Sequence, residues 1–224
     1  MKKEKLVKKN DHLFIEIEKE LWLIDTGSPA SFGTHSINIG GKDFNIPQSF
    51  MGMLDTDYIR EQTKVDCAGL IGSDILNRFD FIFDLQNEEI TLSTDELSME
   101  GNYISLGNVM GCCPIAIQVE VEQNRHTFLL DTGAAISYFA GIRIDHFDSL
   151  GRFHDFHPGN GDFETDMYLV PVSIGDVKLN LRGGTLPSAM EMQIGMLGAH
   201  GIIGNELMDN RKVGYFPRRK MLVL

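Results

Sequence analysis

Two short blocks of the sequence occur twice in the same order, and this repeat limits the fold more than any other feature. The first block, residues 23–28 (Leu-Ile-Asp-Thr-Gly-Ser), recurs as residues 129–134 (Leu-Leu-Asp-Thr-Gly-Ala). The second block, residues 69–76, recurs as residues 201–208. Because two separated blocks recur in the same order, the sequence predicts a duplicated structural unit rather than a chance similarity.

The pattern of apolar residues predicts an all-β fold. Residues 13–17 and 115–121 alternate between apolar and polar side chains, which is typical of half-buried strands. Each of these segments leads to an apolar run, and the two runs end at Asp25 and Asp131. We therefore expect each aspartate to follow a buried strand.

Hairpins and short helices complete the predicted units. Residues 36–46 form two alternating arms around Gly40-Gly41, which is a hairpin signature, and residues 172–179 are their counterpart. Residues 73–79 and their copy, residues 205–210, have the length and composition of a short helix. One short helix is therefore expected in each half of the chain.

The boundary between the halves is predicted from composition. Residues 95–102 are polar and end in Gly-Asn, so they are the expected link. The N-terminal unit is then residues 1–98, and the C-terminal unit is residues 99–224. We further expect the strands near residues 90–92 and 221–224 to join in one sheet.

The second half carries an additional segment, roughly residues 141–171, that has no match in the first half. Its tip, residues 157–162, contains Pro-Gly-Asn-Gly, and such turn-rich tips flanked by aromatic residues suit a mobile hairpin. We expect a flap at about residues 151–168, with no obvious flap in the first half. The candidate flap residues are Phe156, Gly159, Gly161 and Phe163.

The two Asp-Thr-Gly triplets suggest paired carboxylates. If the two halves are related by a pseudo-twofold axis, Asp25 and Asp131 face each other, and two such charges cannot both ionise readily. The ionised carboxylate can then take a proton from a water molecule, while the protonated one donates to a substrate amide carbonyl. This chemistry needs no metal and no organic cofactor.

These residues resemble those of the aspartic peptidases, both pepsin-like and retropepsin-like. The resemblance rests on both Asp-Thr-Gly triplets and on the apolar-apolar-Gly segments at residues 70–72 and 202–204, and it covers residues 13–224. It implies two pseudo-twofold-related retropepsin-like lobes of the acid-protease β-barrel fold, with a cleft between them. The chain looks like a retropepsin dimer fused into one polypeptide, so a monomer is expected to suffice for a complete site.

The resemblance implies a role for each matching residue. Asp25 and Asp131 are the expected catalytic residues of an aspartic endopeptidase, which binds its polypeptide substrate in an extended conformation. The expected supporting and substrate-binding residues are Thr26, Gly27, Ser28, Thr132, Gly133 and Ala134. The predicted single flap departs from the family pattern, because retropepsin dimers have two flaps and pepsin-like enzymes carry theirs on the first lobe.

Two other functions stay open. A duplicated fold that keeps both aspartates can still be a catalytically silent peptide-binding module, if side chains obstruct its cleft. A hydrolase that acts on a non-peptide amide is the second alternative. Intact Asp25 and Asp131 favour the enzyme.

Charge and cysteine content limit which binding partners and which cellular compartment are expected. A net charge of −12 argues against nucleic acid or an anionic membrane as the main partner. The lysine-rich start is not followed by the apolar stretch of a secretory signal, and no run approaches the roughly 18 apolar residues of a membrane span. Three cysteines, two of them adjacent (Cys112 and Cys113), form no even disulfide framework, so we expect reduced thiols in a cytoplasmic protein, with a vicinal redox pair or metal site as the alternative.

Some polar and apolar clusters have two interpretations. A group of His and Asp residues near the flap tip suits solvated loop positions better than a metal site; its members are His154, Asp155, His157 and Asp162. Phe153, Phe156 and Phe163 are expected either to cover substrate or to pack the hairpin onto its lobe. Three methionines are expected to fill gaps in a core or interface, with contact to substrate as the alternative; they are Met190, Met192 and Met196. The basic run at residues 218–220 is interpreted as a solvated turn.

Overall fold

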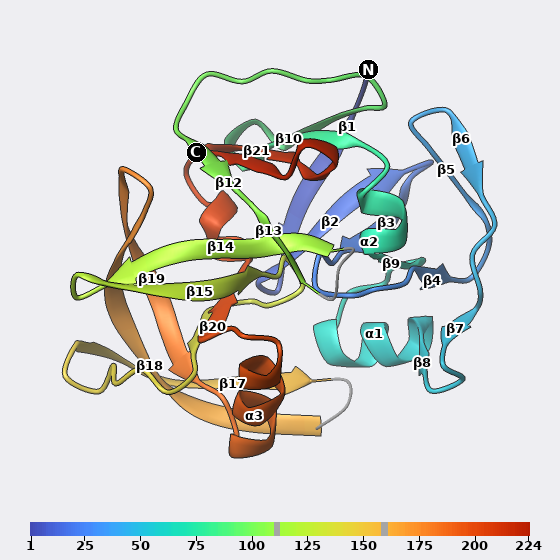
Figure 1. Cartoon of the computed structure of the whole chain (residues 1–224). Coiled ribbons are helices and arrows are strands. Elements are labelled where there is room, and N and C mark those ends of the chain that lie inside the picture. The colour runs from blue at the N-terminus through green and yellow to red at the C-terminus, as the bar shows by residue number, and fades with distance from the viewer. Residues whose placement is uncertain (110–112, 158–160) are drawn as a thin grey trace.

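The computed structural model describes residues 1–109, 113–157 and 161–224 of the chain (Figure 1). Strands account for 51% of the structure and helices for 14%. The prediction of an all-β fold with few helices is therefore confirmed. Within the described residues, no helix is both long enough and apolar enough to cross a membrane.

Ten strands form the larger sheet, which contains most of the first half of the chain and the C-terminal strands. In spatial order they are β12 (Tyr103–Ser105), β22 (Met221–Val223), β21 (Lys212–Phe216), β10 (Asp80–Asp84), β11 (Glu89–Ser93), β1 (Lys2–Lys9), β2 (His12–Ile17), β3 (Glu20–Ile24), β9 (Gly69–Ile71) and β4 (Phe32–Gly33). The predicted strands near residues 90–92 and 221–224 are thus in one sheet, where β21 and β10 lie between them.

Eight strands form the second sheet, which lies entirely in the second half of the chain. Their spatial order is β13 (Gly107–Val109), β14 (Cys113–Val121), β15 (Asn124–Leu130), β20 (Gly201–Ile203), β16 (Ser137–Phe139), β19 (Val177–Thr185), β18 (Gly161–Ile174) and β17 (Asp148–His157). Because β14 also pairs with β18, the six strands from β14 to β18 in this order close into a barrel. Strand β17 continues beyond the barrel as the partner of β18.

Short hairpins and helices fill the remaining described chain. The predicted hairpin around Gly40-Gly41 is present as β5 (Ile37–Ile39) and β6 (Lys42–Phe44), and a second hairpin consists of β7 (Ser49–Phe50) and β8 (Leu54–Asp55). The helices are α1 (Thr56–Thr63), α2 (Ser73–Leu76) and α3 (Ser188–Met196), with 3-10 turns η1 (Leu85–Asn87), η2 (Asn205–Met208) and η3 (Pro217–Arg219). The predicted helix at residues 73–79 is therefore the shorter α2, and its copy is a 3-10 turn. Helices α1 and α3 were not predicted.

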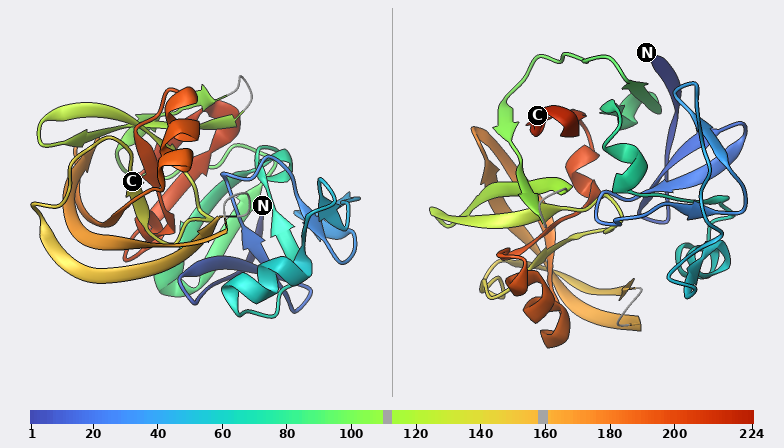
Figure 2. Two further views of the ribbon diagram at one scale, coloured as in Figure 1. Left: turned by 90° about the horizontal axis from the view of Figure 1, so that it is seen from below. Right: turned by 45° about the vertical axis from the view of Figure 1, so that its right-hand side comes forward.

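The hydrophobic core extends through both sheets. One cluster of buried side chains includes Phe81 and Phe83 of β10 as well as Leu130 of β15 and Ile203 of β20. Figure 2 shows the segment between β11 and β12 arching across the top of the molecule, from one group of strands to the other. This segment contains residues 95–102, the predicted link, and it has no helix or strand.

The basic run at residues 218–220 is not simply a solvated turn, and that prediction is wrong. Arg218 and Arg219 both bind the carboxylate of Asp80, whose side chain is fully buried, at 2.9 and 2.6 Å. Asp80 also accepts a hydrogen bond of 3.0 Å from the backbone N–H of Leu97. A buried carboxylate must be paired, and here the arginines of the second half pair a carboxylate of the first.

Candidate active site

Strands β3 and β15 carry the two Asp-Thr-Gly triplets to the centre of the molecule. Each strand pairs in parallel with a short buried strand, β3 with β9 and β15 with β20. This pairing continues into the triplets, because the Asp25 N–H donates to the Ile71 carbonyl at 3.1 Å and the Asp131 N–H donates to the Ile203 carbonyl at 2.9 Å. The backbone of each aspartate is therefore fixed by a neighbouring strand.

The two threonines link the triplets directly. The Thr26 N–H donates to Thr132 Oγ1 and the Thr132 N–H donates to Thr26 Oγ1, both at 3.0 Å. Each hydroxyl in turn donates at 2.8 Å to a strand carbonyl of the opposite half, Thr26 to Leu130 and Thr132 to Ile24. Four buried hydrogen bonds thus hold the two loops in a fixed relative position.

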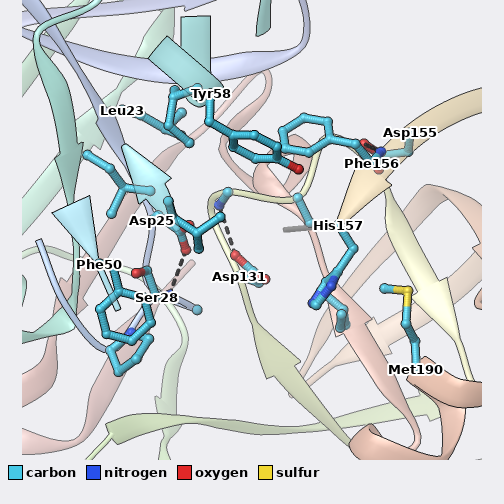
Figure 3. Close-up of a pocket in the computed structure, with 18 of the residues that line it drawn as sticks. Leu23, Asp25, Ser28, Phe50, Tyr58, Asp131, Asp155, Phe156, His157 and Met190 are labelled. Atoms are coloured by element: carbon cyan, nitrogen blue, oxygen red, sulfur yellow. Dashed lines mark hydrogen bonds between the residues drawn. The ribbon is translucent and has the colours of Figure 1, made fainter. Parts of the chain in front are cut away.

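Close approach of the loops brings the carboxyl groups together. A Cβ atom placed on Gly27 would lie 2.5 Å from the Asp131 carboxyl carbon, and one placed on Gly133 would lie 2.7 Å from that of Asp25. Only glycine leaves room for the opposite carboxylate at these two positions. Figure 3 shows both carboxyl groups in the same pocket. Each accepts a hydrogen bond from a backbone N–H: Asp25 from Ser28 at 2.8 Å, and Asp131 from Gly133 at 2.9 Å.

Burial and mutual repulsion control the charge of the pair. Burial raises the pKa of Asp25, and the nearby charge of Asp131 raises it further, well above the usual range of a carboxyl group. Burial also raises the pKa of Asp131, while hydrogen bonds from the Gly133 N–H and from Asp25 oppose this effect. The two groups therefore titrate as a pair, which keeps one proton to a pH above the usual range of a carboxyl group.

A serine and a carboxylate support the loop of the first half. The Gly72 N–H donates to Ser31 Oγ at 2.9 Å, and the Ser31 hydroxyl donates to the Asp74 carboxylate at 2.6 Å. In addition, the Ser73 N–H donates to the Ser28 carbonyl at 2.8 Å. These bonds tie the start of α2 to the loop that holds Asp25.

An equivalent set supports the loop of the second half. The Gly204 N–H donates to Ser137 Oγ at 3.2 Å, and the Ser137 hydroxyl donates to the Glu206 carboxylate at 2.9 Å. Glu206 is buried, which raises its pKa, and it also accepts from the Arg182 N–H at 2.9 Å. Sequence reasoning missed these supports. Ser31 and Ser137 nevertheless lie at the same distance along the chain from their triplets, and Asp74 and Glu206 lie at the same distance from their apolar-apolar-Gly segments.

A cavity of about 510 Å³ opens in front of the two aspartates. Both triplets contribute to its wall, through Asp25, Gly27, Ser28, Asp131, Gly133 and Ala134. The other lining residues are mostly apolar, and they come from both halves: Leu23, Phe32, Phe50, Leu54, Ile59 and Leu70 from the first, and Tyr138, Phe163, Leu186, Met190 and Ile202 from the second. This volume is large enough for several side chains of a bound molecule.

The flap hairpin, formed by β17 and β18, covers one side of this cavity. Phe156, His157 and Phe163 line the cavity, whereas Gly161 does not, and Gly159 lies outside the described residues. Figure 1 shows the hairpin reaching toward α1, and the Phe156 ring packs 6.1 Å from that of Tyr58 in this helix. Residues of the flap from the second half therefore contact the first half.

Asp155 anchors the flap to the barrel rather than facing solvent, so its prediction as a solvated loop residue is wrong. It is buried, which raises its pKa, and it accepts a hydrogen bond from the Tyr138 hydroxyl. Tyr138 also packs against Phe163 with ring centroids 5.8 Å apart. Within the described residues, no three His, Cys, Asp or Glu side chains are grouped so that they could hold a metal ion.

His12 supports the second triplet from the first half of the chain. It is buried, and its Nδ1 lies 3.3 Å from the Gly133 carbonyl oxygen, which can only accept a hydrogen bond. Burial lowers the pKa of this histidine. Its ring packs 5.9 Å from Phe156. No sequence signal identified His12, because a histidine at the start of an alternating strand is compatible with many environments.

The methionines differ from the prediction. Met190 is buried and lines the cavity, but Met192 and Met196 are exposed on α3, so the expectation of a core or interface position is wrong for these two. Met51 and Met53, which sequence reasoning missed, lie in the β7–β8 turn and combine high exposure with a place on the cavity wall.

Of the cysteines, Cys67 is a buried free thiol whose pKa burial raises to about 11, so it stays protonated at neutral pH. Cys112 lies outside the described residues, as does the side chain of Cys113. Comparison of the chain with protein-family models and with curated proteins finds no match.

Proposed function

We propose that this protein is an aspartic endopeptidase in which Asp25 and Asp131 activate a water molecule. The observation that carries this proposal is the reciprocal bonding of the Thr26 and Thr132 loops, which sets the two half-buried carboxyl groups opposite each other at the wall of a cavity. Both groups have raised pKa values, and this is the environment in which one proton is shared by a pair.

The proposed reaction uses the two carboxyl groups in different roles. Ionised Asp131 takes a proton from the water as its oxygen attacks the carbonyl carbon of the scissile amide. Protonated Asp25 donates its proton to the carbonyl oxygen, which gives a neutral tetrahedral diol. Asp131 then returns the proton to the amide nitrogen, the C–N bond breaks, and Asp25 recovers its proton from the diol. No covalent intermediate forms.

The substrate we propose is an extended polypeptide segment with large apolar side chains near the scissile bond. The cavity has apolar walls on both sides of the dyad, built by Leu23, Phe32 and Leu70 on one side and by Leu186, Met190 and Ile202 on the other. Burial of each such side chain from the substrate is worth about 1.5–3 kcal/mol. An extended peptide also offers backbone groups to the edge of the flap.

The equivalent hydrogen bonds of the two triplets support the prediction of two retropepsin-like lobes, residues 1–98 and 99–224, with the flap on the second lobe. Each half supplies one aspartate and one parallel strand pair, β3–β9 or β15–β20. We propose that a single chain therefore carries a complete site. The 510 Å³ cavity favours this enzyme over a silent peptide-binding module with an obstructed cleft.

A peptide-library assay tests the proposal. The protein is incubated with a diverse peptide library at several pH values, and cleavage sites are mapped by mass spectrometry. We expect cleavage between large apolar residues, with a loss of roughly 1000-fold or more in Asp25→Asn and in Asp131→Asn. Asp176→Asn, in the exposed β18–β19 turn, is the matched control. Wild-type turnover in either dyad variant, or no cleavage by the wild type, would exclude the proposed mechanism.

A further inference from the structure

A histidine of the flap shares the cavity with the two aspartates. Among the described residues that line the cavity, His157 is the one side chain that can carry a positive charge. Figure 3 shows His157 beside Asp131, on the side of the pocket toward Met190. The dyad therefore faces a group that can change its charge in the acidic range.

The alternation of strand β17 directs this histidine inward. Successive side chains of a strand point to opposite faces, so His157 and Asp155 share one face and His154 lies on the other. His157 lines the cavity, whereas His154 is exposed and lines only a separate hollow between the flap and the end of α1. The hydrogen bond from Tyr138 to Asp155 fixes this register.

The flap is held over the dyad by contacts with the first half of the chain. Phe156, the residue before His157, packs against Tyr58 of α1 and against His12 of β2, with ring centroids 6.1 and 5.9 Å apart. His157 thus lies beside Asp131 when Phe156 occupies this position. An opening movement of the hairpin would carry both residues away together.

The titratable groups around His157 come from several elements. Asp25 and Asp131 face it from the two triplets, Asp155 from its own strand, and the tyrosines Tyr58 and Tyr138 from α1 and β16. His12 and Asp162 line the separate hollow together with His154. Burial lowers the pKa of His157, whereas the charges of Asp131 and Asp155 raise it, and the His157 charge in turn lowers the pKa of Asp131.

We propose that His157 is a positioning residue that acts through Asp131: carried by the flap, its imidazolium stabilises the Asp131 carboxylate and so sets which member of the dyad is ionised. This inference rests on the proposed peptidase function and adds the control of its charge state. Where His157 is protonated, its charge favours the ionised form of Asp131. The productive charge state of the dyad is therefore favoured when the flap is closed, and an open flap withdraws this support.

The consequence for pH dependence has a definite sign. Activity requires ionised Asp131, so the acid limb of the profile follows the pKa of this carboxyl. Removal of the His157 charge raises the pKa of Asp131 and moves the acid limb to higher pH.

Two matched substitutions on one strand test the inference. His157→Gln removes the charge beside Asp131, and His154→Gln makes the same chemical change on the opposite face of β17. The pH profile of kcat/KM is measured for both, together with the ¹³C chemical shift of the Asp131 carboxyl carbon across a pH titration. We expect His157→Gln to lower kcat/KM on the acid side by roughly threefold or more, with a higher Asp131 titration midpoint. His154→Gln should match the wild type in both measurements.

Each other outcome is decisive. A rise in KM of His157→Gln without a shift of the acid limb or of the Asp131 midpoint would make His157 a simple substrate contact and overturn the inference. A shifted midpoint in a protein that cleaves no peptide would support the electrostatic role of His157 while the proposed function fails. Equal effects of both substitutions would also contradict the inference, because only His157 lies in the cavity.

Discussion

Thr26 and Thr132 hold each other by a reciprocal pair of hydrogen bonds, each from a backbone N–H to the other hydroxyl at 3.0 Å. Both residues are buried, and each hydroxyl donates a hydrogen bond to a strand carbonyl of the opposite half. Every hydroxyl in this arrangement donates once and accepts once, so no group is left unsatisfied by the pairing. The distance between the two aspartates therefore depends on the threonines, although neither threonine has a chemical role in the proposed reaction.

Substitution of a threonine should expose this dependence. Thr26→Val keeps the shape of the side chain but leaves the Thr132 N–H and the Leu130 carbonyl without their partners. We expect a loss of about 2–4 kcal/mol in the free energy of unfolding, measured by urea denaturation, because each unsatisfied buried group costs about 1–3 kcal/mol. Thr26→Ser keeps the hydroxyl and is the control. Equal stabilities of the Val and Ser variants would contradict the importance of the hydroxyl.

The glycines of the triplets should limit activity more than stability. Gly133→Ala places a Cβ atom 2.7 Å from the Asp25 carboxyl carbon, so the end of that flexible side chain must move. Misplacement of a reacting group by about 1 Å costs roughly 100-fold in rate. We expect kcat to fall by about this factor while thermal unfolding changes little. Gly195→Ala on α3, where a Cβ meets nothing within 4 Å, should retain full activity.

The all-β character of the fold was predictable from the sequence, because alternation reports directly which face of a strand is buried. The hairpin at Gly40-Gly41 was predictable because its turn needs positive φ values, 61° and 77°, which glycine adopts readily. The turns at Glu18-Lys19 and Glu122-Gln123 have the same left-handed conformation, with φ values between 49° and 72°. Glutamate, lysine and glutamine give no turn signal in a sequence. Here the pairing of the flanking strands imposes the left-handed backbone conformation on them.

The candidate site was only partly predictable for a related reason. Asp25 and Asp131 were identified because the triplets repeat within the chain. His12, Tyr58 and Tyr138 reach the site through folding of segments that are distant in sequence, and nothing in their local sequence distinguishes them from core residues. The supports Asp74 and Glu206 occupy matching positions of the second repeated block, but nothing in that block indicated that their carboxylates support the triplets.

Burial of the dyad should make stability depend on pH in a defined direction. The pKa of Asp25 is raised by folding, so the stabilising effect of its protonated form is complete below the ordinary carboxyl pKa of 3.8 and is lost as the pH rises toward the raised value. Asp25→Asn cannot ionise and avoids this loss. We expect the variant to match the wild type in unfolding free energy at low pH and to exceed it near neutral pH. Parallel urea titrations at both pH values measure the difference, and a less stable variant at neutral pH would contradict the raised pKa.

The buried Asp80 should be among the most sensitive positions for stability. Its carboxylate binds Arg218 and Arg219 from the second half and the Leu97 N–H from the link. Asp80→Ala leaves two arginines without their shared partner, which should cost about 3–5 kcal/mol in the free energy of unfolding. Glu88→Gln breaks an exposed ion pair of 3.7 Å with Lys5 and should cost less than about 1 kcal/mol. Equal losses would show that burial of Asp80 is not what makes the pair important.

Closure of the flap should depend on Phe156. Its ring contacts Tyr58 and His12 of the first half, so Phe156→Ala removes the apolar contact that holds the hairpin across the cavity. The flap should then open at lower free-energy cost, because these ring contacts join it to the first half. We expect a higher KM and a lower kcat, since a closed flap excludes water and orients the substrate. Amide hydrogen exchange in β17 should become faster, while the free energy of global unfolding changes by less than about 1 kcal/mol.

Leu150→Ala, at an exposed position on the same strand, is the control and should leave the kinetics, the exchange and the unfolding unchanged. If Phe156→Ala accelerates exchange but leaves peptide cleavage intact, the hairpin is not needed for turnover and its proposed role as a flap is wrong.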